Sequence, residues 1–194
     1  MNKIAVIGIG RWGKNLIREF KKIADIKTCY YKGNHNTRYW LKQNYPEIKR
    51  ADSYEKILKD KDIETVVIAT PIKTHFSLAH KALKAGKHVF LEKPMTDNPA
   101  NAKKLVELAK KNNLILFIGH LYVYHPVLQK IKTLVKNDPI IYAKFVWNKL
   151  GHFTENILWN LVCHEISIAM EIMGAPKKIS VMDKKGFLTD GDIL

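Results

Sequence analysis

The fold of this 194-residue chain follows from one segment near its N-terminus, Ile4-Ala-Val-Ile-Gly8-Ile-Gly10-Arg-Trp-Gly13. The apolar run is typical of a buried strand, and glycines spaced G-x-G-x-x-G follow it where a helical pattern begins. Gly8 permits a tight turn, Gly10 lets the backbone approach a pyrophosphate, and Gly13 lets the helix pack closely on the strand. Together with Arg11 and Trp12, these glycines are the candidate dinucleotide-binding loop. The rival interpretation is an ordinary glycine-rich turn.

Apolar runs of four to six residues then alternate with segments of helical period. This order predicts an α/β fold with a parallel sheet and crossover helices. The predicted strands are 4–8, 26–31, 48–51, 65–70, 88–91 and 114–118, and the predicted helices are 11–23, 54–58, 75–85 and 98–111. Six strands with interposed helices predict a complete, doubly wound Rossmann domain over residues 1–119.

The alternation changes after Gly119. Residues 126–135 and 158–173 have helical period, and residues 140–147 and 178–183 read as strands, followed by a turn at 189–192. We interpret residues 120–194 as the start of an α+β second domain concerned with substrate binding and oligomerisation. Two strands leave that domain partial, so we expect a C-terminally truncated chain or a fragment of a longer protein.

Composition narrows the class of protein. Hydrophobic residues make up 46% of the chain, as in folded globular proteins. Cys29 and Cys163 are too few and too far apart for a disulfide framework, a zinc site or a redox pair, so we expect no metal and a cytoplasmic setting. The apolar stretch 114–128 contains histidines and falls short of the roughly 20 apolar residues of a membrane span, which predicts a soluble protein.

The formal net charge of +15 would attract polyanions or phosphorylated small molecules. The lysines are scattered through helical segments without an interleaved aromatic platform, so we favour a solvated surface over nucleic-acid binding.

The end of the second strand bears on the choice of cofactor. An acidic residue about 20 residues beyond the glycines would bond the ribose of NAD, but the stretch 28–38 contains no Asp or Glu. Lys32, Gly33, Asn34 and Arg38 would instead accommodate the 2′-phosphate of NADP. We therefore favour NADP over NAD, the alternative being that Lys32 and Arg38 are merely solvated.

A later segment, Gly86-Lys-His-Val-Phe-Leu-Glu-Lys-Pro94, together with the glycine loop, strongly resembles the glucose-fructose oxidoreductase, inositol dehydrogenase and rhizopine catabolism family. The Glu92-Lys93-Pro94 triplet is the most specific match, supported by Thr70-Pro71, His75, Gly119-His120 and His125-Pro126. The resemblance implies an NAD(P)-dependent oxidoreductase whose cofactor site includes Thr70, Pro71, His75, Glu92, Lys93, Pro94 and His120. It also implies that Lys93 lies beside the nicotinamide and the substrate hydroxyl, and that a cis peptide bond precedes Pro94.

The resemblance further implies a second catalytic element, an aspartate followed four residues later by a histidine on one helix. Here His164 matches the histidine, and Asn160 replaces the aspartate. Asn160 can hydrogen-bond a hydroxyl but cannot ionise, so a catalytically impaired cofactor-binding protein is the alternative to an active enzyme. The sequence around Trp159 most resembles that of family members that oxidise nucleotide-linked amino sugars. A free sugar or a cyclitol stays open as substrate, and a homo-oligomer is expected for a full-length protein.

Overall fold

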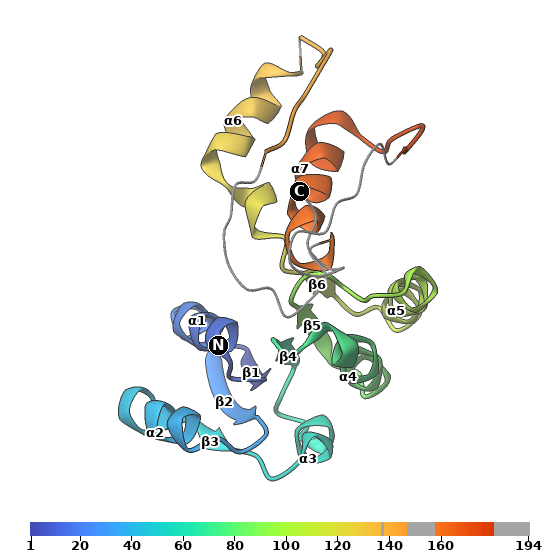
Figure 1. Ribbon diagram of the computed structural model, residues 1–194. Helices are drawn as coiled ribbons and strands as arrows, with labels where there is room; N and C mark the ends of the chain where they lie inside the picture. The colour runs from blue at the N-terminus through green and yellow to red at the C-terminus, as the bar shows by residue number, and fades with distance from the viewer. Residues whose placement is uncertain (137, 147–157, 181–194) are drawn as a thin grey trace, which may run out of the picture. The chain divides into compact units, whose positions relative to one another are not determined.

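A six-stranded, all-parallel sheet organises the N-terminal part of the protein (Figure 1). The computed structural model describes residues 1–136, 138–146 and 158–180, and the chain divides into two units, Met1–Gly119 and His120–Leu194. The first unit contains β1 (Lys3–Ile7), α1 (Arg11–Phe20), β2 (Asp25–Tyr30), α2 (His35–Asn44), β3 (Lys49–Arg50), α3 (Tyr54–Lys59), β4 (Thr65–Ile68), α4 (Ile72–Lys84), β5 (His88–Leu91), α5 (Pro99–Lys111) and β6 (Leu116–Ile118). The strand order β3-β2-β1-β4-β5-β6 is that of a doubly wound Rossmann sheet, which confirms the predicted fold class.

Two apolar clusters cover the two faces of the sheet. Along β1, Ile4 and Val6 belong to one cluster and Ala5 and Ile7 to the other, as the two-residue period of a strand requires. Helices α1 and α2 contribute to the first cluster, and α3, α4 and α5 to the second. Figure 1 shows the same division of the helices between the two sides of the strands. The sheet is therefore buried on both faces, as parallel sheets are.

The expected dinucleotide site lies at the carboxyl ends of β1 and β4, which are neighbouring strands. Val6 pairs with Val67, so the loops that follow these two strands are neighbours. The Gly8 amide donates to the Tyr30 carbonyl at 2.8 Å, which joins the glycine loop to the end of β2. The strand order reverses between β1 and β4, and ligands of such sheets bind in the crevice at that point.

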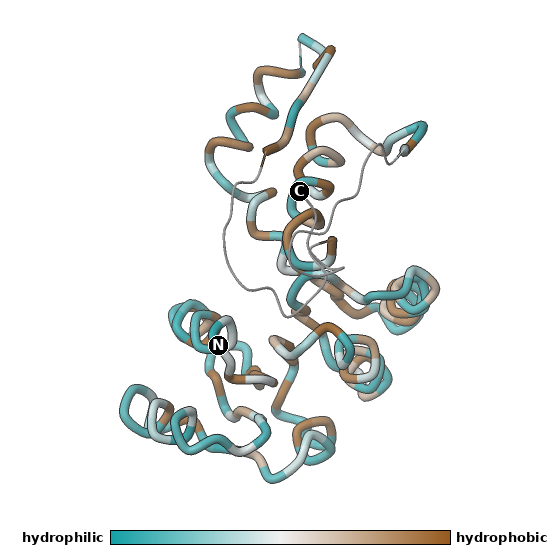
Figure 2. Tube along the Cα trace, viewed as in Figure 1, coloured by the Kyte–Doolittle hydropathy of each residue, from teal (hydrophilic) through white to brown (hydrophobic). Residues whose placement is uncertain are grey.

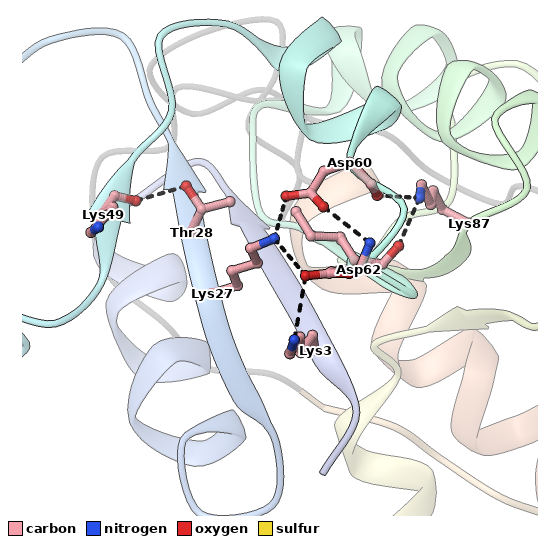
Figure 3. Close-up of polar contacts among 8 residues, drawn as sticks. Lys3, Lys27, Thr28, Lys49, Asp60, Asp62 and Lys87 are labelled. Atoms are coloured by element: carbon pink, nitrogen blue, oxygen red, sulfur yellow. Dashed lines mark hydrogen bonds and ion pairs between the residues drawn. The ribbon is translucent and has the colours of Figure 1, made fainter.

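The opposite, amino-terminal edge of the sheet carries an ionic cluster, which we call the amino-edge cluster and define as Lys3, Lys27, Asp60, Asp62 and Lys87 (Figure 3). Lys27 Nζ lies 2.6 Å from Asp60 Oδ2 and 3.2 Å from Asp62 Oδ2, and Lys3 Nζ lies 3.4 Å from Asp62 Oδ2. Lys87 is buried, and its ammonium group donates to the carbonyls of Asp60 and Ile63, each at 2.7 Å. These bonds hold the turn between α3 and β4, far along the strands from the glycine loop.

One helix of the first unit was not predicted, and another begins earlier than expected. Helix α2 begins after Asn34, whose side-chain oxygen accepts hydrogen bonds from the amides of Asn36 and Thr37. Most of its exposed residues are polar, and Tyr39 is 69% exposed, so its apolar period is weak. Helix α4 begins at Ile72, directly after Pro71, rather than at His75.

The second unit contains a 3-10 turn η1 (Leu121–Tyr124), α6 (Pro126–Leu134), a π-helical turn η2 (Leu158–Val162) and α7 (Cys163–Met173). The two predicted helices are present, but residues 140–146 and 178–180 are not strands, which corrects the sequence prediction for them. A strand requires a hydrogen-bonded neighbour, and no described residue pairs with these segments. Residues 147, 181–183 and the expected turn at 189–192 lie outside the described residues. None of the described helices is long and apolar enough to cross a membrane.

Candidate functional site

The glycine loop has the geometry that a bound pyrophosphate needs. Gly8 has a φ of +87°, and a Cβ atom there would lie 2.6 Å from the Ala69 carbonyl oxygen. A Cβ atom on Gly13 would lie 2.0 Å from the Gly8 carbonyl oxygen, so only glycine lets α1 start this close to the turn. Above Gly10, by contrast, no atom lies within 4 Å of a Cβ position. The loop is thus tightly packed at Gly8 and Gly13 and has free space at Gly10. Through that space a phosphate can approach the amides at the start of α1.

A hollow of about 620 Å³ extends from this loop along the carboxyl ends of the strands. Among its lining residues are six that the sequence analysis assigned to the cofactor, namely Gly8, Gly10, Lys32, Asn34, Thr70 and Pro71. The sequence analysis missed another group that lines it: Tyr54, Glu55, Ser77, Leu78 and Lys81 from α3 and α4. Its volume and mixed lining suit a nucleotide-sized ligand.

A smaller hollow of about 170 Å³ adjoins the end of β2, and its lining residues are Tyr31, Gly33, Asn34, His35, Arg38 and Arg50. The sequence analysis identified Arg38 but missed Arg50. Strand β3 pairs with β2 so that Arg50 lies opposite Cys29, which brings its side chain to the same end of the sheet. The Arg50 guanidinium carbon lies 5.1 Å from the centre of the Tyr31 ring, and an Nη atom donates to the Tyr31 carbonyl at 3.4 Å. Two guanidinium groups therefore share this hollow, and no Asp or Glu lines it.

The Glu92-Lys93-Pro94 triplet follows β5, and the Lys93–Pro94 peptide bond is cis, as the resemblance implied. Lys93 is half-buried, and its amide donates to Glu92 Oε2 at 3.3 Å. Glu92 is only 7% exposed, and Oε1 has no hydrogen-bond partner among the described residues. Burial raises the pKa of the Glu92 carboxyl, which the Lys93 amide and charge partly offset. A Cβ atom on Gly119 would lie 3.2 Å from Glu92 Oε1, so the small residue makes room for this carboxyl.

His75 does not lie on the wall of either hollow, although the sequence analysis placed it in the cofactor site. Its ring is 1% exposed. Nδ1 lies 2.9 Å from the Pro94 carbonyl oxygen, and Nε2 lies 2.7 Å from the Thr70 carbonyl oxygen. Both ring nitrogens thus lie within hydrogen-bond distance of backbone carbonyl oxygens. The side chain therefore contacts the protein interior and not the space of either hollow.

Arg11 and Trp12 lie on the first turn of α1 with exposed side chains, and Trp12 is 51% exposed. Neither residue lines either of the two hollows, so the loop contributes its backbone rather than these two side chains. Within the part of the chain that the structure describes, no three His, Cys, Asp or Glu residues gather as metal ligands do.

The second unit holds the remaining candidates. Asn160 lies in the π-helical turn η2 and His164 in α7, four residues apart across the junction of the two helical segments. The His164 ring meets the edge of Tyr122, with ring centres 4.8 Å apart. His120 lines an apolar hollow of about 430 Å³ within this unit, together with Leu158, Trp159, Val162, Cys163, Ile166, Ser167 and Met170. His120 is thus the first residue of the second unit and directly follows Gly119, the last residue of the first unit.

Comparison with known proteins identifies relatives over most of the chain. The chain is 28% identical over 175 residues to a UDP-N-acetylglucosamine 3-dehydrogenase of Acidithiobacillus ferrooxidans, which covers 89% of this chain and 55% of that protein. It is 30% identical over 139 residues to a myo-inositol 2-dehydrogenase of Thermotoga maritima, which covers 71% of this chain and 42% of that protein. The chain therefore spans about half or less of the length of these relatives.

Solved structures agree on the fold. An NAD-binding protein from Listeria innocua superposes with a TM-score of 0.74 at 21% identity, over 88% of this chain and 54% of that one. Residues 2–120, more than half of the chain, match the model of an oxidoreductase family with an NAD-binding Rossmann fold. The chain is accordingly a member of the GFO_IDH_MocA family of oxidoreductases.

Proposed function

We propose that this protein, as part of an NADP-preferring oxidoreductase, transfers a hydride between a hydroxyl-bearing carbon of a sugar and the nicotinamide ring. The observation that supports it best is the hollow along the carboxyl ends of the strands, which begins at the open face of Gly10 and is adjoined by the two guanidinium groups. The α1 amides would hold the pyrophosphate, and Thr70 and Pro71 would line the path of the dinucleotide. When bound, the nicotinamide supplies the hydride acceptor or donor.

The preference for NADP rests on charge. Arg38 and Arg50 line the smaller hollow, and Lys32 lines the larger one beside it. Guanidinium groups bind phosphate oxygens through paired, charge-assisted hydrogen bonds. A carboxylate that would bond an unmodified ribose is missing from the lining residues of the smaller hollow.

The proton that leaves the hydroxyl requires an acceptor on the protein. By the family resemblance, we propose Lys93 and His164 for this task, since an amine or imidazole without its proton can accept one as hydride leaves the carbon. Asn160 would hydrogen-bond the sugar through its amide. The relatives named for UDP-N-acetylglucosamine and myo-inositol support a sugar, nucleotide sugar or cyclitol as the small-molecule substrate. From the cysteine usage alone, we propose the cytoplasm as the place of the reaction.

Parallel fluorescence titrations with NADPH and NADH test the proposal. The unmodified protein should bind NADPH at least about tenfold more tightly, and Arg38→Leu and Arg50→Leu should each weaken NADPH binding by about tenfold while leaving NADH binding unchanged, since each removes a charge-assisted bond to phosphate. Arg18→Leu is the matched control, because Arg18 is an exposed residue of α1 paired with Glu19. A preference for NADH would contradict the NADP assignment, and binding of neither cofactor would contradict the dinucleotide site.

A further inference from the structure

His75 joins two loops that follow neighbouring strands. The Thr70 carbonyl belongs to the loop after β4, which lines the large hollow, and the Pro94 carbonyl belongs to the loop after β5, which carries Lys93. The ring is 1% exposed and reaches both carbonyls from α4. The ring therefore lies within hydrogen-bond distance of both of these loops at once.

The chemistry of these two contacts makes the ring a hydrogen-bond donor. A carbonyl oxygen only accepts hydrogen bonds, so the ring donates through a nitrogen that carries a hydrogen. Nδ1 faces the Pro94 oxygen at 2.9 Å and Nε2 faces the Thr70 oxygen at 2.7 Å, so either tautomer donates to one loop while the ring packs against the other. Because the side chain is 1% exposed, bulk water does not compete for these contacts.

We propose that His75 is a positioning residue whose buried ring fixes the Lys93 loop against the Thr70 loop. The ring lines neither of the two hollows. It acts through the Pro94 carbonyl, next to Lys93, and through the Thr70 carbonyl at the wall of the hollow. Its relevance to Lys93 rests on the proposed function, but the bridge itself does not.

Nitrogen-15 NMR of the unmodified 194-residue chain tests the bridge directly. The ring hydrogen of His75 should exchange slowly with solvent, because the nitrogen that carries it is buried and donates to a backbone carbonyl. A ring hydrogen that exchanges as fast as that of an exposed histidine would overturn the bridge. This measurement requires no variant to fold and no cofactor to bind.

Hydrogen exchange of His75→Gln tests the bridging role. Peptides covering residues 69–74 and 92–96 should exchange about tenfold faster, while peptides covering β1 and β4 stay protected, because local opening is set by local bonds. The matched control is His80→Gln, on the same helix, where the ring packs on Phe76 at 5.4 Å between centres. Unchanged exchange in both loops, or equal acceleration through the whole sheet, would overturn the proposal.

Ligand binding separates positioning of the site from filling of the core. His75→Gln should weaken NADPH binding by about tenfold and binding of 2′-phospho-ADP-ribose by less, because that fragment meets the Thr70 loop but lacks the nicotinamide end that the Lys93 loop would face. Equal weakening of both ligands would overturn the positioning role. If the unmodified protein binds neither ligand, the proposed function fails, and the NMR and exchange results still decide the bridge.

Discussion

The two units of this chain differ in how completely their described residues cover apolar side chains. In Met1–Gly119, 26 hydrophobic residues are buried and six large ones are exposed, whereas the described part of His120–Leu194 buries two and exposes fifteen. Figure 2 shows hydrophobic segments recurring along α6 and α7. A parallel sheet flanked by helices buries both of its faces with its own residues, but these helices carry more apolar surface than the described residues of their own unit cover.

This contrast predicts where stability and chemistry reside. Each buried apolar side chain of the first unit contributes free energy of folding through residues of that same unit. The second unit contributes candidate residues for substrate chemistry, His164 and Asn160, with little burial of its own. Mutations should therefore affect stability strongly in the first unit and weakly in the second.

The largest expected effect is that of Leu83→Ala in α4. Leu83 is fully buried beneath the sheet, so the truncation should lower the free energy of unfolding by about 2–5 kcal/mol. Met170→Ala in α7 is the counterpart in the second unit, and because Met170 is 51% exposed its effect should stay within about 0.5 kcal/mol. Urea titration followed by tryptophan fluorescence measures both. Equal losses would abolish the contrast between the units.

The next effect concerns the amino-edge cluster. Lys87→Met should cost about 1–3 kcal/mol of unfolding free energy, because the carbonyls of Asp60 and Ile63 would lose a buried donor. Lys84→Met, at the exposed last residue of α4, just before the α4–β5 connection, is the control and should have a small effect. The same urea titration measures the unfolding free energy of both variants. If Lys87→Met leaves the unfolding free energy unchanged, the turn between α3 and β4 is held by the ion pairs alone.

Much of the first unit could be predicted from the sequence because its signals are local. Apolar runs such as that of β4, each followed by a helical period, give the strand and helix order, and the spacing of Gly8, Gly10 and Gly13 gives the loop. Helix α2 has a weaker signal, the capping residue Asn34, and was missed because only Thr37 and Leu41 of its residues are buried. In the described residues 140–146 and 178–180, the expected strands show the opposite failure, since apolar β-formers pair only where a neighbour exists.

The parts of the site that could not be predicted depend on the order of the strands. Arg50 joins the basic hollow only because β3 lies next to β2 at the edge of the sheet. The matching signal was a basic residue at the end of the third strand, which has meaning only after that order is known. His75 was assigned to the cofactor from the family resemblance, and only the packing of α4 shows that its ring is turned to two backbone carbonyls.

Asn160→Asp tests whether the second unit contributes to the chemistry rather than to the stability. An ionised carboxylate at this position could stabilise a protonated His164, so turnover with UDP-N-acetylglucosamine or myo-inositol should rise by about tenfold, while the urea midpoint stays unchanged. Asn101→Asp on α5 is the matched substitution in the first unit and should leave turnover as it was. Turnover that stays the same in Asn160→Asp would argue that the missing aspartate is not what limits the reaction.

The smallest expected effect separates the ion pairs of the amino-edge cluster from its buried lysine. The hydrogen bond from Lys27 lowers the pKa of the Asp60 carboxyl below its usual value of 3.8, so the stabilisation is present above about pH 4 and is lost as the pH falls through the lowered pKa. Asp60→Asn should thus reduce the melting temperature at about pH 7, by a difference equivalent to about 1 kcal/mol or less, since the pair is partly solvated. The gap between Asp60→Asn and the unmodified protein should close as the pH falls through the lowered pKa of Asp60, and Asp97→Asn, at an exposed position outside the cluster, is the matched control for the substitution itself. A gap that persists at low pH would contradict the ion-pair explanation, because an asparagine oxygen can still accept the hydrogen bond that the Asp62 amide donates to Asp60 Oδ1 at 3.0 Å. Either outcome separates the charge of Asp60 from its backbone bond as the source of stability at this end of the sheet.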